Sequence, residues 1–175
     1  MERKIKWGII GPGRIAHKFV SDLILIEDAE VTGVASRSLQ KAKQFADEFN
    51  IEHAFGSYEE LFAFDEVDIL YIATPHNFHK DLAIKAMEAG KHVLCEKPIA
   101  LTVKDGEAMV RAAKKARVKF MVAHVIRFWP EYVYLKKLVK RKKLGRLRSI
   151  TLTRLSPRPM WSWQNWIQQP GKSGG

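Results

Sequence analysis

The chain contains a single cysteine, Cys95, among its 175 residues, so no intrachain disulfide can form. No apolar run approaches the roughly 20 residues that span a bilayer. The first residues have neither the apolar stretch nor the small-residue cleavage site of a secretory signal. The spacing of histidine and cysteine does not suggest a metal site. These absences favour a cytoplasmic protein without a bound metal, in a compartment that keeps thiols reduced.

Acidic residues are scarce in the last third of the chain. Residues 111–175 hold 17 basic and one acidic side chain, whereas residues 1–110 hold 13 basic and 18 acidic ones. One interpretation of the densest basic stretch, residues 136–148, is a surface for nucleic acid or an anionic membrane. The alternative is a solvated helix face with Leu135, Leu138 and Val139 turned inward. We favour the helix face, because a nucleic-acid module more often interleaves aromatic residues, and we expect neither partner.

Short apolar runs alternate with helical patterns, which is typical of an α/β protein with a parallel sheet and crossover helices. The pattern predicts strands over residues 6–10, 30–35, 67–73, 92–95 and 118–123, and we count the last as the sixth strand. It predicts helices over residues 14–26, 39–49, 77–89 and 102–116, with a short helix opened by a capping box at Ser57. This rhythm predicts a Rossmann doubly wound sheet over residues 1–123.

The pattern changes after residue 123. A basic helix is expected over residues 131–142, residues 148–155 alternate like a half-exposed strand, and residues 156–175 show no clear period. One helix and one strand are too little to bury an independent core. We therefore expect residues 124–175 to be an incomplete piece of a second domain.

A glycine-rich turn, Gly11-Pro12-Gly13-Arg14-Ile15-Ala16, joins the first strand to the first helix. Gly11 permits a tight turn, Gly13 lets the backbone approach phosphate, and Ala16 is small enough for helix–strand packing. The helix N-terminus then faces a pyrophosphate with its N–H groups. We expect a dinucleotide site built from Gly11, Pro12, Gly13, Arg14 and Ile15; a merely tight turn is the alternative.

The end of the second strand reads Ala35-Ser36-Arg37-Ser38, without the acidic residue that usually holds the ribose 2′-hydroxyl of NAD. Serine hydroxyls and an arginine suit a 2′-phosphate, and Lys41 adds charge one turn later. Ser36, Arg37 and Lys41 therefore favour NADP, with NAD less expected. The serines could instead cap the following helix, and both roles are compatible.

Two further segments follow predicted strands at the carboxyl edge, where parallel sheets bind ligands. The first supplies Thr74, Pro75, His76 and His79; helix capping and surface exposure are the alternative for the two histidines. The second is Glu96-Lys97-Pro98, whose lysine can donate to a substrate oxygen and shuttle a proton. Read alone, the tripeptide could be a turn with a surface salt bridge. We take Lys97 as the catalytic candidate and Glu96 and Lys97 as cofactor contacts.

Together these residues resemble the Gfo/Idh/MocA family of oxidoreductases. The resemblance covers the whole chain and rests on the stretches 7–16, 36–38, 71–75, 89–98 and 127–130. It implies an open-sheet α+β domain after the Rossmann domain, and hydride transfer at a carbon of a sugar, polyol or diol. It implies a cis Lys97–Pro98 bond, with Lys97 beside the nicotinamide. It also adds Arg127, and Trp166 in a loop edging the pocket, to the expected cofactor residues.

The resemblance also implies a downstream helix that bears an aspartate and a histidine for substrate binding and proton transfer. This chain ends at Gly174-Gly175, before that helix. Two hypotheses therefore stay open: a dehydrogenase or the N-terminal part of one, and a non-catalytic nucleotide-binding subunit. In either case we expect a homo-oligomer or a complementary C-terminal chain as partner. Alone, the chain is expected to bind cofactor without turnover.

Overall fold

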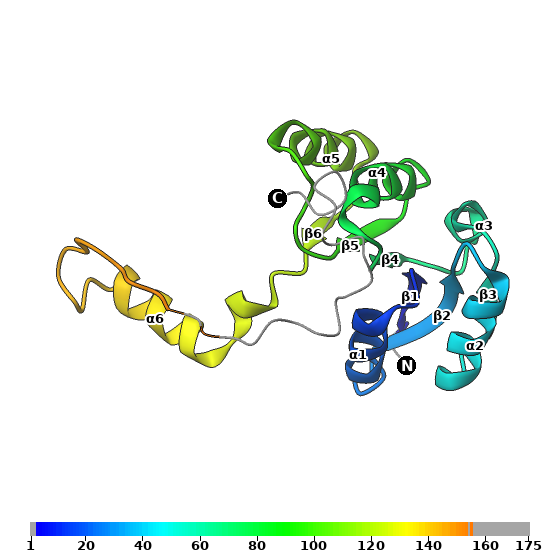
Figure 1. Ribbon diagram of the computed structural model, residues 1–175, viewed down its shortest axis with the longest axis horizontal. Helices are drawn as coiled ribbons and strands as arrows, with labels where there is room; N and C mark the ends of the chain where they lie inside the picture. Colours follow the sequence, from blue (N-terminus) through cyan, green and yellow to red (C-terminus); the bar gives the residue numbers. More distant parts are fainter. Residues whose placement is uncertain (1–2, 154, 156–175) are drawn as a thin grey trace.

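The short apolar runs form one parallel sheet in the structure, a computed structural model that describes residues 3–153 and 155. Its strand order is β3-β2-β1-β4-β5-β6, and all neighbouring pairs are parallel (Figure 1). The strands are β1 (Ile5–Ile10), β2 (Ala29–Ala35), β3 (His53–Phe55), β4 (Ile69–Ile72), β5 (His92–Cys95) and β6 (Phe120–Val122). This order reverses beside β1, so the predicted doubly wound Rossmann fold is confirmed.

Helices connect the strands and cover both faces of the sheet. The α-helices are α1 (Arg14–Leu23), α2 (Leu39–Phe49), α3 (Tyr58–Ala63), α4 (His79–Glu88), α5 (Val103–Ala116) and α6 (Pro130–Lys140). Two 3₁₀ turns, η1 (His76–Phe78) and η2 (Val125–Phe128), precede α4 and α6. Two of the described helices begin at polar caps where the sequence predicts them. The Ser57 side chain accepts the backbone N–H of Glu60 at the start of α3, and the Thr102 side chain accepts that of Asp105 at the start of α5.

Two separate apolar cores lie on the two faces. Adjacent residues of β1 point to opposite sides, with Ile9 in one core and Ile10 in the other. Apolar side chains of α1 and α2 build the first core, and those of α3, α4 and α5 build the larger second one. Because both faces are covered, the strands carry continuous apolar runs rather than an alternating pattern.

Three local expectations differ from the structure. Strand β3 was not located from the sequence, because a three-residue strand is too short to show a period. The helix predicted over residues 77–89 begins as the 3₁₀ turn η1. In the described part of the segment expected as a strand, residues 148–153 and 155, there is no strand. A strand needs a neighbouring strand to pair its backbone N–H and C=O groups, and no strand of the described chain pairs with this segment.

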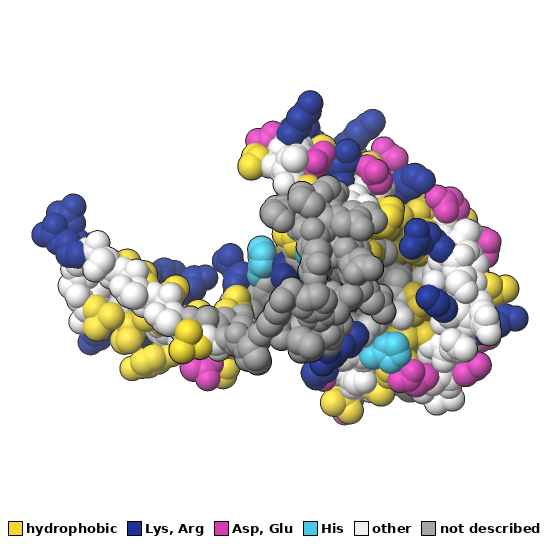
Figure 2. Space-filling model, viewed as in Figure 1, with side chains coloured by type: hydrophobic (Ala, Val, Ile, Leu, Met, Phe, Trp, Pro, Cys, Tyr) yellow, Lys and Arg dark blue, Asp and Glu magenta, His cyan; other side chains and the backbone are white. Residues whose placement is uncertain are grey.

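Helix α6 lies apart from the sheet (Figure 1). Leu135 and Val139 are each 37% exposed, so the expectation that they turn inward against this chain is wrong for the described residues. The space-filling view shows apolar side chains and Lys or Arg side chains together on this projecting part (Figure 2). The basic helix is therefore amphipathic, but none of its residues is fully buried in the described chain.

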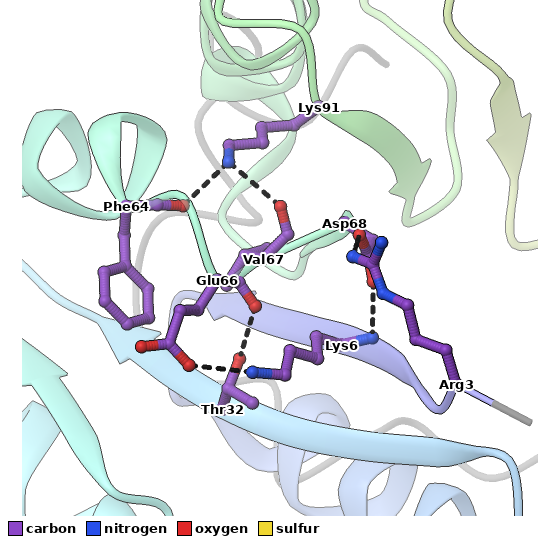
Figure 3. Close-up of polar contacts among 8 residues, drawn as sticks. All are labelled: Arg3, Lys6, Thr32, Phe64, Glu66, Val67, Asp68 and Lys91. Carbon is purple, nitrogen blue, oxygen red and sulfur yellow. Dashed lines mark hydrogen bonds and ion pairs between the residues drawn. The ribbon is translucent and has the colours of Figure 1, made fainter. Parts of the chain in front are cut away.

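A buried lysine joins the amino end of the sheet to the loop before β4. Lys91 is 8% exposed, and its Nζ donates to the carbonyl oxygens of Phe64 at 2.7 Å and Val67 at 2.9 Å. Figure 3 shows these contacts beside the Lys6–Glu66 and Arg3–Asp68 ion pairs. An ammonium can stay buried only where such acceptors replace its water.

Replacing Lys91 with Met should lower the free energy of unfolding by about 1–3 kcal/mol, because two buried carbonyls lose their donor. Urea unfolding of the variant and the parent measures this. Lys43, an exposed lysine of α2, provides the matched control. An equal loss in Lys43→Met would contradict the role assigned to Lys91.

Candidate functional site

The site forms where the loops after β1, β4 and β5 are held side by side. The N–H of Gly11 donates to the Ala35 carbonyl at 3.1 Å, just past the end of β1. The N–H of Ala73 donates to Ile10 at 2.9 Å, and that of Glu96 to Ile72 at 2.9 Å. Each loop therefore starts with a backbone bond to the neighbouring strand, which fixes its first residue.

A cavity of about 1080 Å³ opens at this edge of the sheet. Its walls come from the glycine-rich turn, from α1 and α2, and from the loops after β4 and β5. The lining residues are Pro12, Gly13, Arg14, Ile15, His17, Lys18, Lys41, Gln44, Phe45, Glu48, Ala73, Thr74, Pro75, His76, Glu96 and Lys97. The structure thus brings together most of the residues expected to bind the cofactor.

The glycine-rich turn leaves room for an anion at the start of α1. Gly11 has a φ of +86°, and a Cβ there would lie 3.0 Å from Thr74 Cγ2 and 3.1 Å from the Ala73 carbonyl oxygen. Both the turn and the packing therefore require glycine. At Gly13, the N-cap of α1, a Cβ would meet no heavy atom within 4 Å. This open space beside an uncapped helix N-terminus fits the pyrophosphate of a dinucleotide.

His17 is a lining residue that the sequence did not reveal. Its Nδ1 lies 2.9 Å from the Gly13 carbonyl oxygen, and its Nε2 lies 3.0 Å from Glu48 Oε2. Its ring also packs edge-on against Phe45, with 4.7 Å between centroids. His17 therefore ties the glycine-rich turn to α2. The only sequence signal was its place four residues after Gly13, on the same face of the helix.

The end of β2 carries polar and basic groups but no carboxylate. Ser36 is buried and its Oγ accepts from the N–H of Ser38, while Ser38 Oγ caps α2 by accepting from Lys41 N. Arg37 is exposed, and its guanidinium carbon lies 5.5 Å from the centroid of the Phe78 ring. Lys41 lines the cavity. The capping alternative thus holds for Ser38, and it leaves Arg37 exposed.

A hydrogen-bonded pair lies beneath Lys97. The Tyr71 hydroxyl donates to Glu96 Oε1 at 2.6 Å, and the backbone N–H of Lys97 donates to Glu96 Oε2 at 3.2 Å. Tyr71 is buried and stacks on Phe19, with 3.8 Å between centroids. Burial and the neighbouring Glu96 raise the pKa of Tyr71, so its hydroxyl stays a donor. This hydrogen bond was not expected from the sequence, in which Tyr71 reads as an ordinary residue of a buried strand.

Lys97 itself is exposed and lines the cavity, and the Lys97–Pro98 bond is cis. Within residues 3–153 and 155, its ammonium forms no ion pair, so the surface salt bridge considered for this turn is not present there. Its neighbour Cys95 is fully buried, and burial raises the pKa of the thiol to about 12. Lys97, and not Cys95, therefore offers a reactive group to the cavity.

The two histidines after β4 differ in position. His76 lines the cavity, whereas His79 is fully buried below it and is not a lining residue. His79 Nδ1 lies 2.8 Å from the Pro98 carbonyl oxygen, and Nε2 lies 3.0 Å from that of Thr74. The alternative interpretation, that His79 is exposed at the surface, is therefore wrong. Burial lowers its pKa, although the two carbonyls act in the opposite direction. A neutral ring can donate to only one of them.

One buried atom of the lining has no protein partner in the described chain. Thr74 Oγ1 is covered from solvent and forms no hydrogen bond among residues 3–153 and 155. A buried hydroxyl of this kind commonly marks a place for a ligand or water atom. Together with the space at Gly13, it supports a fit between these residues and a bound dinucleotide.

Five of the expected cofactor residues in the described chain do not line the cavity: Gly11, Ser36, Arg37, His79 and Arg127. Arg127 is exposed in η2 and is not a lining residue. Trp166 lies outside the described residues. Both therefore stay predictions. The part of the chain that the structure describes also has no cluster of three or more metal-binding side chains and no helix long and apolar enough to cross a bilayer.

The profile of the family described as "Oxidoreductase family, NAD-binding Rossmann fold" matches residues 5–124 of this chain. The chain belongs to the Gfo/Idh/MocA family. The match covers all six strands of the sheet and the cavity at its carboxyl edge. This family membership agrees with the resemblance seen in the sequence.

Curated relatives in this family include dehydrogenases of diols and inositols. The chain is 40% identical over 147 residues to trans-1,2-dihydrobenzene-1,2-diol dehydrogenase of Xenopus laevis, covering 83% of this chain and 44% of that protein. It is 42% identical over 147 residues to the NADP(+)-dependent scyllo-inositol 2-dehydrogenase of Bacillus subtilis, covering 84% and 44%. The chain thus spans less than half the length of these relatives.

Solved structures of the same family share the fold. The WlbA dehydrogenase from Bordetella pertussis, in complex with NADH and UDP-GlcNAcA, has a TM-score of 0.77 and 29% identity; the match covers 82% of this chain and 44% of that one. A 3-ketoreductase from Actinomadura kijaniata, in complex with NADP, has a TM-score of 0.77 and 27% identity, covering 83% and 46%. The family therefore contains proteins solved with either nicotinamide cofactor.

His79 should stabilise the fold at neutral pH and less so in acid. Its pKa is lowered in the folded state from the ordinary 6.5, so the unfolded chain takes up the proton first as the pH falls. The contribution is complete above pH 6.5 and is lost below it. We expect His79→Gln to lower the free energy of unfolding by about 1–3 kcal/mol at neutral pH, by removing a buried hydrogen-bonded ring.

The same variant should also shrink the difference in Tm between neutral and mildly acidic buffer, which thermal unfolding at both pH values measures. His124, which is exposed, supplies the control variant His124→Gln. If His79→Gln keeps the full pH difference of the parent, another group causes it.

Proposed function

We propose that this chain is the cofactor-binding part of an NADP-dependent oxidoreductase that transfers hydride between the nicotinamide and a carbon of a sugar, polyol or diol. One observation carries the proposal: a single cavity joins the glycine-rich turn to Lys97. A dinucleotide whose pyrophosphate lies at Gly13 can extend along this cavity toward β5. Residues 124–175 would then begin the substrate and oligomerisation domain.

The residues around the cavity divide into three roles in this proposal. The turn at Gly11 and Gly13, with the N-terminus of α1, binds the pyrophosphate. Thr74, Pro75, His76 and Glu96 line the middle of the cavity, with Arg127 and Trp166 as further expected contacts. In reduction, the Lys97 ammonium donates a hydrogen bond to the substrate carbonyl oxygen and gives it a proton; in oxidation, the neutral Lys97 amine takes the proton of the substrate hydroxyl and becomes the ammonium. The bound nicotinamide supplies the hydride acceptor or donor.

The hydrogen bonds of Glu96 hold the backbone of Lys97 in one position, which suits a residue that transfers a proton. Glu96 accepts from Tyr71 on one side and from the backbone of Lys97 on the other. Glu96 bonds to the backbone of Lys97, and the Lys97 ammonium forms no ion pair within the described part of the chain. Its Nζ can therefore reach a substrate oxygen in this proposal. Geometry of this kind determines how well a proton-transfer group works.

The residues at the end of β2 favour NADP over NAD. Arg37 and Lys41 lie there without a carboxylate that would repel a 2′-phosphate, and Arg37 forms no ion pair within the described part of the chain. The relatives named as diol and inositol dehydrogenases favour a sugar, polyol or diol as the substrate.

A second candidate is a non-catalytic nucleotide-binding subunit that needs a complementary chain. The partly exposed apolar residues of α6 favour it, because an amphipathic helix usually packs its apolar side against another element. The two candidates differ in turnover and not in cofactor binding. Assaying the chain with a panel of sugars and diols, alone and with a candidate complementary chain, distinguishes them.

NADP(H) should bind more tightly than NAD(H). Removing charge-assisted contacts with Arg37→Ala should weaken NADP binding by about 1.5–3 kcal/mol and leave NAD binding nearly unchanged. Calorimetric titration of both proteins with both cofactors measures this. Equal binding of the two cofactors by the parent, with no effect of Arg37→Ala, would remove the argument for NADP.

Lys97→Ala should lower kcat by about 10²–10⁴-fold in whichever form of the protein shows turnover, because a proton-transfer group is lost. Cofactor binding should largely persist, since the turn and helix that hold the pyrophosphate are unchanged. Steady-state kinetics and cofactor titration on the same preparations separate the two effects. Near-normal kcat in Lys97→Ala would show that the residue is only part of a turn.

A further inference from the structure

Arg37 is held by two side chains that come from other loops of the carboxyl edge. Arg37 follows β2, Tyr58 opens α3 after β3, and Phe78 ends η1 after β4. The guanidinium carbon lies 5.5 Å from the Phe78 centroid, within the range of a cation–π contact. The guanidinium also lies close enough to the Tyr58 phenol to oppose the effect of burial on the pKa of that phenol. Three loops far apart in sequence therefore meet around one cation.

Tyr58 and Phe78 are placed so that they have little freedom themselves. Tyr58 is half-buried and packs against the core on the α3 side, and its backbone is fixed by the Ser57 cap. Phe78 is 38% exposed, but its N–H donates to the Pro75 carbonyl at 3.0 Å. The guanidinium lies over this ring, so the contact joins η1 to the end of β2.

No carboxylate of residues 3–153 and 155 forms an ion pair with Arg37. Glu59, the acidic residue adjacent to Tyr58, is paired with Lys85 at 2.9 Å. Burial raises the pKa of Tyr58, and the Arg37 guanidinium opposes this, as expected for an uncompensated cation beside the phenol. An arginine with a fixed plane and an unpaired charge is suited to a phosphate, which it can bind through two N–H groups.

We propose that Tyr58 and Phe78 are positioning residues that fix the Arg37 guanidinium for the 2′-phosphate of the cofactor. The proposal rests on the proposed NADP preference. An unsupported arginine loses much side-chain freedom when it binds an anion, and this loss weakens binding. Tyr58 and Phe78 impose that order before the cofactor arrives. The discrimination between NADP and NAD is then set by three loops and not by the end of β2 alone.

The test compares 2′,5′-ADP with 5′-ADP, two probes that differ in the 2′-phosphate. Calorimetric titration is performed on the 175-residue chain and its variants. Tyr58→Phe removes only the hydroxyl and should weaken 2′,5′-ADP by about threefold to tenfold. Phe78→Leu should weaken it by about twofold to fivefold, whereas Phe78→Trp keeps an aromatic face and should bind like the parent. The affinity for 5′-ADP should stay within about twofold throughout.

A double-mutant comparison separates positioning from a general structural effect. In the Arg37→Ala background, Tyr58→Phe and Phe78→Leu should have no further effect on 2′,5′-ADP, because the group they position is gone. Glu59→Gln is the matched control, since Glu59 adjoins Tyr58 but pairs with Lys85. Equal weakening of both probes, or an effect that persists without Arg37, would overturn the proposal.

Failure of the proposed function would look different. If the parent chain binds neither probe, the assignment of a dinucleotide site fails, and the proposal fails with it. If it binds both probes equally, the NADP preference fails. If it prefers 2′,5′-ADP and the preference does not depend on Tyr58 or Phe78, only the positioning role is overturned.

Discussion

The last backbone hydrogen bonds at the carboxyl edge of the sheet determine the rest of the site. Gly11, Ala73 and Glu96 each donate their N–H to the neighbouring strand just where their own strand ends. These bonds align three loops before any side chain is considered. The glycine-rich turn, the Thr74 segment and the Lys97 segment can share one cavity because the register of β1, β4 and β5 places their starts side by side.

Close packing within the sheet makes this register unique. A Cβ on Gly8 would lie 2.7 Å from Leu70 Cδ2, and one on Gly33 would lie 2.9 Å from Leu61 Cδ1. Apolar side chains therefore fill the space above both glycines, and a slip of β1 or β2 would force a side chain into it. The core thus fixes the edge on which the cofactor would bind, and one core residue, Phe45, also lines the cavity there.

Polar groups below the cavity connect the fold to its chemistry. Tyr71 and His79 are both buried, and each bonds to the segment that carries Lys97, through Glu96 and through the Pro98 carbonyl. Such groups cost free energy unless they are bonded, so they favour one arrangement of the loop above them. Arg37, at the end of β2, likewise lies close to side chains from two neighbouring loops. The basic residues Lys41 and Lys97 line the cavity itself.

The sequence by itself determined the α/β class, most helices and strands, and the three segments that meet at the carboxyl edge, because apolar periodicity, caps and glycine positions are local properties. It did not show β3, which is too short to have a period, or the roles of His17 and Tyr71, which look like ordinary helix and strand residues. Only the tertiary structure decided that His79 is buried and that Arg37 lies near Tyr58 and Phe78. These facts depend on contacts between loops far apart in the chain, and the physical reason is that burial and pairing are properties of the packed sheet and not of any one segment.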